Sequence, residues 1–237
     1  MRARVIRRSV VRLLVTWILV AVLGCGRETP TTPQCTPTAR PRVPPPTGFV
    51  PCPTADELSR IDIPISFEGG ASAGGTLVCR EADGSWDLNQ VQKNVYRALL
   101  LMQTVQFDAP LPWTSRNLYQ WLRDAVAGIR IRTDIATNGC CQPTRVINLL
   151  GTGVDEDTLS YGYLEMMVHE ARHAEGRNHT CGTNDRTLSE MGAYGVQYSL
   201  MLWIGTHWPQ ATPAERDFAM NRTVLLRASG VFCEECE

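Results

Sequence analysis

The sequence predicts an α+β domain in which a small sheet packs against several helices, and three patterns carry this prediction. Large apolar side chains occupy every second position from Ile61 to Phe67, as in a half-buried strand. From Leu88 to Val105, apolar residues recur every three or four positions, as on one face of a helix. Thr212-Pro-Ala-Glu215 is a capping box with proline at the first helical position, so a final helix is expected to run to about residue 228.

Shorter patterns supply the remaining elements in chain order. The long helix is expected over residues 87–106, and the apolar spacing from Leu118 to Val126 indicates a second helix. Short strands are expected at residues 76–80, 129–131 and 146–150. Another helix is expected over residues 188–202, with Asp185 as its N-cap.

Residues 1–24 have the composition of an export signal. Five arginines precede an apolar run at residues 13–23, which is too short to cross a bilayer comfortably. The run ends in Val22-Leu23-Gly24-Cys25, which resembles the lipobox of bacterial lipoproteins, where cleavage precedes a cysteine that is then acylated. The alternative is an ordinary cleaved signal peptide.

A lipid on Cys25 would tether the mature chain to a membrane surface without spanning the membrane. The next residue is Gly26 rather than aspartate, which resembles the pattern of outer-membrane sorting. The resemblance therefore implies a lipid-anchored protein of the bacterial cell envelope, on the periplasmic side of the outer membrane or at the surface.

Two regions of different composition follow the signal. Residues 25–56 are rich in proline and threonine and hold few large apolar side chains, so we expect an extended spacer that does not fold alone. Residues 57–237 are long enough for one domain with its own core. The formal net charge of −1 gives no reason to expect a nucleic-acid partner.

Nine cysteines are many for a reducing compartment, and setting Cys25 aside leaves an even eight. We expect these to form disulfides, one of which would anchor Cys181 just after His179. A competing interpretation is a zinc knot formed by Cys140, Cys141, Cys233 and Cys236. The first pair lacks the two-residue spacer that such sites use.

Three of the four histidines of the chain lie in the segment HEARHAEGRNH, which begins at His169. On a helix, His169 and His173 lie one turn apart on the same face, so both imidazoles can reach one ion. Glu170 is turned by about 100° around the helix axis, where it can hold a water on the metal. Gly176 can end the helix in a left-handed turn, which would bring back His179 as a third ligand.

This segment fits the pattern HExxHxxGxxH and resembles the zinc signature of the metzincin metallopeptidases and, more loosely, of zincins generally. The resemblance covers eleven residues. It implies a zincin-like fold with the HExxH motif on a central helix. It also implies a Zn²⁺ ion held by His169, His173 and His179, with Glu170 as the general base that acts on a zinc-bound water.

The resemblance is incomplete after His179. Metzincins carry a methionine in a tight turn beneath the metal, whereas Met191 and Met201 fall inside the helix expected here. The segment around Glu190 is instead similar to the helix that supplies a glutamate ligand in gluzincins. The third ligand is therefore expected to be His179, with Glu190 as the alternative and Asp185 as a third candidate.

The resemblance implies a zinc-dependent, metallopeptidase-like hydrolase of the cell envelope that acts on a peptide or protein substrate. Glu170 would take a proton from the zinc-bound water and pass it to the leaving amine, and Tyr194 or Tyr198 would assist at the oxyanion. The alternative is an exported lipoprotein with a structural or inactive metal site, acting as a binding or envelope-assembly module. A closed site that uses both His179 and Glu190 would favour this alternative, because no position would remain for water.

Overall fold

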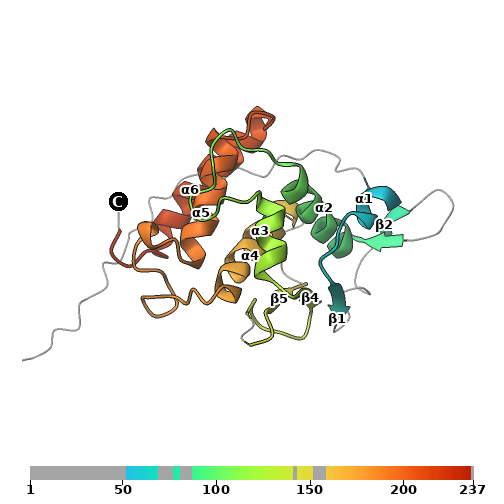
Figure 1. The fold of residues 1–237 in the computed structure, drawn as a ribbon, viewed down its shortest axis with the longest axis horizontal. Coiled ribbons are helices and arrows are strands. Elements are labelled where there is room, and N and C mark those ends of the chain that lie inside the picture. Colours follow the sequence, from blue (N-terminus) through green and yellow to red (C-terminus); the bar gives the residue numbers. More distant parts are fainter. Residues whose placement is uncertain (1–51, 69–76, 81–86, 141–142, 152–158, 236–237) are drawn as a thin grey trace, which may run out of the picture. The chain divides into compact units, whose positions relative to one another are not determined.

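The computed structural model describes residues 52–68, 77–80, 87–140, 143–151 and 159–235 (Figure 1). All of them belong to one contact unit, residues 32–237. The predicted signal peptide, Cys25 and most of the predicted spacer lie outside the described residues. The first described helix begins at Ala55, which falls within the range predicted as spacer.

The described elements combine helices with a small sheet, as predicted. In chain order they are α1 (Ala55–Ser59), β1 (Ile65–Glu68), β2 (Leu77–Arg80), β3 (Asp87–Asn89), α2 (Gln90–Thr104), α3 (Leu118–Ala125), β4 (Gly128–Arg132), β5 (Val146–Leu150), α4 (Leu159–Ala174), the 3₁₀ helix η1 (Leu188–Glu190), α5 (Ala193–Thr206) and α6 (Pro213–Ala228).

A parallel sheet of three strands, in the order β1-β4-β5, forms the β part of the core. Ile65 pairs with Ile129, and Ile129 pairs with Ile147. Ile129, Ile131, Ile147 and Leu149 are fully buried, as expected for parallel strands covered by helices. The chain passes through α2 and α3 between β1 and β4, while β2 and β3 form a separate antiparallel pair.

Two predicted elements begin later than expected. The strand predicted from Ile61 starts only at Ile65, because Pro64 has no N–H to donate to a ladder. The carbonyl oxygen of Pro64 instead accepts the N–H of Ile129 at 2.9 Å. Helix α2 also starts later than predicted, because the residues before it form β3 and pair with β2.

Helix α4 lies at the centre of the helical layer. It packs against α2, α3, α5 and β5, and in Figure 1 it lies between the α5–α6 pair and the sheet. Its apolar side chains Tyr163, Met167 and Ala171 are fully buried in the core. Burial on several sides fixes the position of this helix, which a precise metal site requires.

The segment before α5 differs most from its prediction. Instead of one helix over residues 188–202, the chain forms η1, turns at Met191 with φ of 49°, and begins α5 after Gly192. Asp185 is therefore not the N-cap residue. Its side chain caps α5 through space, because Oδ2 accepts the N–H of Gly195 in the first turn at 2.9 Å. A carboxylate there satisfies a free helix N–H and faces the positive end of the helix.

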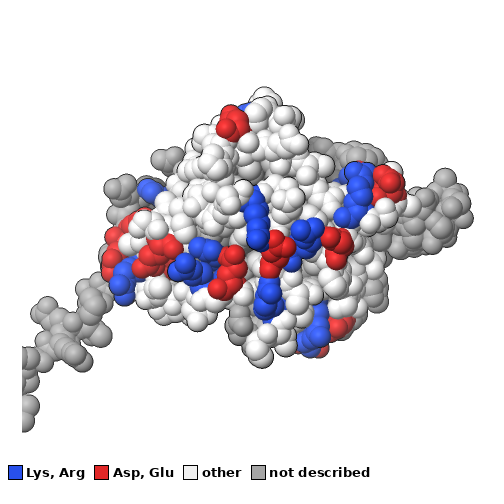
Figure 2. All heavy atoms as spheres, viewed as in Figure 1, with Lys and Arg blue, Asp and Glu red and all other residues white. Residues whose placement is uncertain are grey.

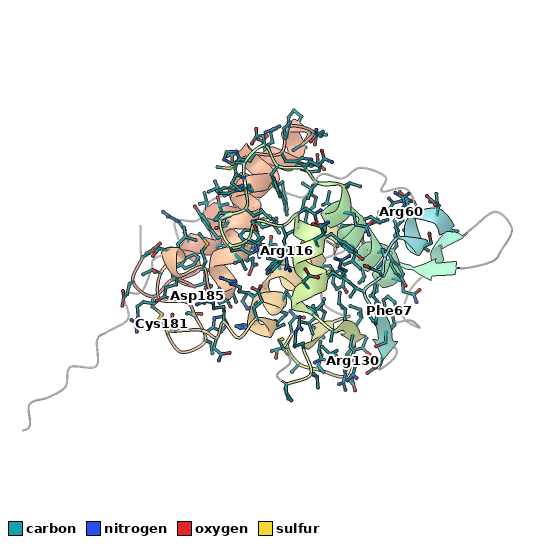
Figure 3. The ribbon with its side chains drawn as sticks, in the orientation of Figure 1. Arg60, Phe67, Arg116, Arg130, Cys181 and Asp185 are labelled. Atoms are coloured by element: carbon teal, nitrogen blue, oxygen red, sulfur yellow. A yellow bond between two sulfur atoms is a disulfide. The ribbon has the colours of Figure 1, made fainter. Side chains whose placement is uncertain are left out.

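The capping box at Thr212 is present, and α6 covers its predicted range. On the face shown in Figure 2, basic and acidic side chains lie next to one another in a band. Such pairs join Arg60 to Asp56 at 2.7 Å and Arg130 to Glu68 at 3.7 Å (Figure 3 labels both arginines). None of the described helices combines the length and apolar character needed to cross a membrane.

Candidate metal centre

Helix α4 carries the HExxH sequence and ends at Ala174, and Gly176 makes the predicted left-handed turn just after it. Gly176 has φ of 83°, and its N–H donates to the carbonyl of His173 at 2.9 Å. The following N–H, of Arg177, donates to the carbonyl of Arg172 at 3.2 Å. These two bonds form a Schellman motif, which reverses the chain after the helix. The reversal brings His179 back towards α4.

The three histidines of the motif converge. Their ring centroids are 5.0 Å apart for His169 and His173, 5.3 Å for His169 and His179, and 4.6 Å for His173 and His179. Each ring offers one nitrogen to a cluster in which all three nitrogens lie within 4.8 Å of one another. Three imidazoles at these separations could hold one metal ion. The structure therefore brings together the three residues that the motif predicted.

In all three rings, Nδ1 faces a hydrogen-bond acceptor. The distances are 3.1 Å from His169 to Oε1 of Gln197, 2.7 Å from His173 to the carbonyl oxygen of Arg177, and 2.9 Å from His179 to Oδ1 of Asp185. An acceptor at this position favours the tautomer that carries its proton on Nδ1. Each Nε2 then keeps a free lone pair, which is what a metal ligand needs.

A buried polar network supports His169. Nε2 of Gln197 donates to Oε2 of Glu165 at 2.6 Å, and Nε of Arg222 donates to both oxygens of Glu165 at 2.8 and 2.9 Å. The network links α4, α5 and α6. The sequence analysis missed Gln197, because no local pattern relates it to a histidine 28 residues away.

A disulfide and the C-terminal tail support His179. Cys181 forms a disulfide with Cys233, which confirms the prediction that the ligand loop is anchored in this way. The N–H of Asp185 donates to the carbonyl of Val231 at 3.1 Å, and the N–H of Cys233 donates to the carbonyl of Asp185 at 3.0 Å. Figure 3 shows Cys181 and Asp185 close together on this loop, beside α5.

The competing zinc knot is wrong. Cys233 is already bonded to Cys181, and Cys140 is also disulfide-bonded, as is Cys52. A sulfur in a disulfide has no thiolate to offer a metal. These disulfide-bonded cysteines therefore contribute to stability, and the histidines remain the candidate ligands.

Glu170 lies beside the histidines in a nearly closed environment. The residue is 5% exposed, and burial raises the pKa of its carboxyl group to about 7. Its Oε2 is buried and has no hydrogen-bond partner among the described residues. Buried polar atoms are nearly always paired, so an unpaired carboxylate oxygen on a residue that lines a cleft indicates a place for a ligand or water.

Two of the histidines, His169 and His173, are held in the neutral form. Burial, together with the nearby rings of His173 and His179, lowers the pKa of His169 to about 3. Burial also lowers the pKa of His173. Neutral imidazole is the form that binds a metal, so these two ligands are ready for an ion near neutral pH.

The cluster opens into a cleft of about 580 Å³, whose lining includes Glu170, Met166 and the segment from Thr137 to Cys140. Tyr194 also lines the cleft. Its ring stacks on His179 with centroids 5.1 Å apart and meets His169 edge-on at 4.5 Å. Tyr198 lies elsewhere, with its ring 6.0 Å from Phe232. Of the two tyrosines considered, only Tyr194 lies in the cleft.

The other candidates occupy different places. Oε2 of Glu190 accepts hydrogen bonds from the side chain of Thr180 and, at 3.3 Å, from the N–H of Arg186, and Glu190 does not belong to the histidine cluster. Asp185 contacts the ring of His179 at its Nδ1. Met191 lies in a left-handed turn and not inside a helix, contrary to the prediction. Its carbonyl accepts from Arg172.

Comparisons with models of protein families, with curated proteins and with solved structures find no match for this chain. The function therefore has to be inferred from the geometry of the histidine cluster and the cleft beside it.

Proposed function

We propose that this protein is a zinc-dependent hydrolase of the metallopeptidase type with a zincin-like arrangement around the HExxH helix. One observation carries the proposal: three imidazoles converge with their Nδ1 atoms engaged, next to a buried carboxylate whose Oε2 has no hydrogen-bond partner among the described residues. His169, His173 and His179 would hold the ion. Three protein ligands are typical of catalytic zinc sites, which keep one position open.

A bound zinc ion would supply a Lewis acid that makes a water molecule acidic near neutral pH and polarises a substrate carbonyl. Residues of the chain would transfer the proton and stabilise the charge that develops on the substrate. Glu170 lies in the cleft and has a raised pKa near 7, so its carboxylate can accept a proton from the water and return it to the leaving amine. A carboxyl group that acts first as a base and then as an acid needs a pKa close to the pH at which the enzyme works.

Tyr194 is the residue placed to assist. It lies in the cleft against His169 and His179, and burial raises the pKa of its hydroxyl group. A hydroxyl that stays protonated can donate a hydrogen bond to an oxygen that gains negative charge during the reaction. We therefore assign oxyanion stabilisation to Tyr194.

The experiment compares three purified proteins for zinc content and for hydrolysis of a denatured protein substrate. The wild-type chain is expected to hold zinc and cleave the substrate. Glu170→Gln should keep its zinc but lose about 10²- to 10⁴-fold in rate, because it cannot move the proton. His207→Gln is the matched control, since His207 caps α5 and contacts Asp108 instead of the cleft. Wild-type protein without zinc, or an active Glu170→Gln variant, would refute the proposal.

We also propose that the hydrolase is lipid-anchored at Cys25 in the bacterial cell envelope and acts there on a peptide or protein substrate. The lipobox-like Val22-Leu23-Gly24-Cys25 supports this location. The disulfide between Cys181 and Cys233 supports an oxidising compartment. Cys25→Ser should move the protein from the membrane fraction to the soluble fraction of fractionated cells, and an unchanged distribution would rule out the anchor.

A further inference from the structure

Asp185 is a buried carboxylate that lies behind one of the proposed ligands. The residue is 1% exposed, and burying a carboxylate is costly unless hydrogen bonds compensate for the lost water. Both carboxylate oxygens of Asp185 have hydrogen-bond partners. Oδ1 lies 2.9 Å from Nδ1 of His179, and Oδ2 accepts the N–H of Gly195 at 2.9 Å. The carboxylate therefore bridges the third histidine and the start of α5.

The start of α5 is shaped around this carboxylate. A Cβ atom added at Gly192 would lie 2.5 Å from Oδ2 of Asp185, which is closer than nonbonded atoms can approach. Only glycine leaves room for the carboxylate at this position. The side chain of Asp185 is thus confined by sterics as well as by its hydrogen bonds.

The backbone of Asp185 is fixed as well. Its N–H and carbonyl bond to Val231 and Cys233 of the C-terminal tail, at 3.1 and 3.0 Å. The disulfide from Cys181 to Cys233 closes the same region. A side chain held by α5, by the tail and by sterics has one available orientation, and that orientation presents an acceptor to His179.

We infer that Asp185 is a positioning residue of the metal centre. It holds His179 in the tautomer with the proton on Nδ1, directs the Nε2 lone pair towards the ion, and ties this ligand to α5 and the C-terminal tail. The inference rests on the proposed metal function. It assigns the orientation of the third ligand to a residue outside the HExxHxxGxxH segment.

Replacement by asparagine tests this role because it keeps the shape and removes one acceptor. If the amide oxygen faces the N–H of Gly195, the amide NH₂ faces Nδ1 of His179 and favours a proton on Nε2, where it blocks the metal. If the amide is reversed, the N–H of Gly195 loses its acceptor and stays buried without one, which destabilises this arrangement. Zinc binding has to select the second, costlier arrangement.

The experiment measures zinc affinity by competition with a chelator, and the imidazole tautomers by ¹⁵N NMR on the metal-free full chain at about pH 8, where imidazoles are neutral. Asp185→Asn should lower zinc affinity by about 10- to 100-fold. It should also move His179 towards the tautomer with the proton on Nε2. Gly192→Ala, which pushes the carboxylate away without touching His179, should lower zinc affinity as well.

The matched control is Asp108→Asn. Asp108 contacts Nδ1 of His207 at 2.8 Å, a similar pair on the surface, and its variant should alter only the NMR signals of His207. Two results for Asp185→Asn would overturn the inference while leaving the proposed function standing. The variant could bind zinc as the wild type does, or it could lose affinity without a tautomer change at His179. Wild-type protein that binds no zinc would overturn both.

Discussion

At the scale of single residues, the burial of Glu170 has a measurable cost in the metal-free protein. Its pKa is raised from 4.5 to about 7, so between these values the folded chain holds a proton that the unfolded chain releases. The contribution of this group to stability therefore falls as the pH rises through this window, and above it the fold contains a buried charge whose Oε2 has no hydrogen-bond partner among the described residues.

Glu170→Gln should remove this cost. With a chelator present, we expect the free energy of unfolding to rise by up to about 3 kcal/mol at about pH 8, and to change little at about pH 5. Denaturant unfolding at the two pH values measures the difference. Glu68→Gln is the control, because the side chain of Glu68 is 43% exposed and pairs only loosely with Arg130. A gain of equal size at both pH values would contradict the explanation.

At the residue scale, the sequence predicts the three histidines of the site but not the residues that hydrogen-bond to them. His169, His173 and His179 were predictable because helix geometry and one glycine relate them within eleven residues. Their hydrogen-bond partners were not, because Gln197 lies on another helix and contacts His169 only after α4 and α5 have packed. The sequence offers Asp185 as a third ligand or as an N-cap, but its role depends on where its carboxylate points in three dimensions.

At the scale of elements, the end of α4 determines whether His179 can reach the other histidines. Gly176 has φ of 83°, and no side chain lies near its Cβ position, so the backbone alone requires glycine there. Gly176→Ala is expected to cost about 1 to 2 kcal/mol of stability. Zinc affinity should fall too, because the strained turn displaces the ligand loop. Gly176→Asn should lose less, since asparagine tolerates the left-handed region.

Gly230→Ala is the matched control for this prediction. Gly230 follows the C-terminus of α6 with φ of 74° and also has an open Cβ position. The two alanine variants should lose similar stability in thermal unfolding, and Gly176→Ala should lose more zinc affinity in chelator competition. Equal zinc affinities in the two variants would show that the turn does not position His179.

The elements also differ in how well the sequence predicted them. Helices α3 and α6 carry strong periodic patterns and end signals, and both were predicted correctly. The start of β1 was not, because the prediction followed the apolar alternation past Pro64, which has no N–H for a ladder. Strand β3 and the turn at Met191 were not predicted either, because each depends on a distant segment. Strand β3 exists through its pairing with β2, and the turn at Met191 precedes a helix that Asp185 caps through space. Local propensity contains no information on such contacts.

At the scale of the whole molecule, the disulfide between Cys181 and Cys233 links the loop of the third ligand to the C-terminal tail across 52 residues. Closing a loop of this length stabilises the fold by about 4 kcal/mol through the entropy of the unfolded chain. The enclosed segment contains η1, α5 and α6, which carry Tyr194, Gln197 and Arg222. The bond therefore closes the part of the chain that supports two of the three histidines.

The double variant Cys181→Ser/Cys233→Ser should lower the melting temperature and weaken zinc binding, because His179 and Asp185 lose their covalent anchor beside the tail. Zinc should then restore less stability than it does in the wild type, since binding must also order the loop. Thermal unfolding with and without zinc measures both effects. His207→Gln should keep the full zinc-dependent gain. A double variant that loses stability but keeps wild-type zinc affinity would mean that hydrogen bonds from the tail suffice to place the third ligand.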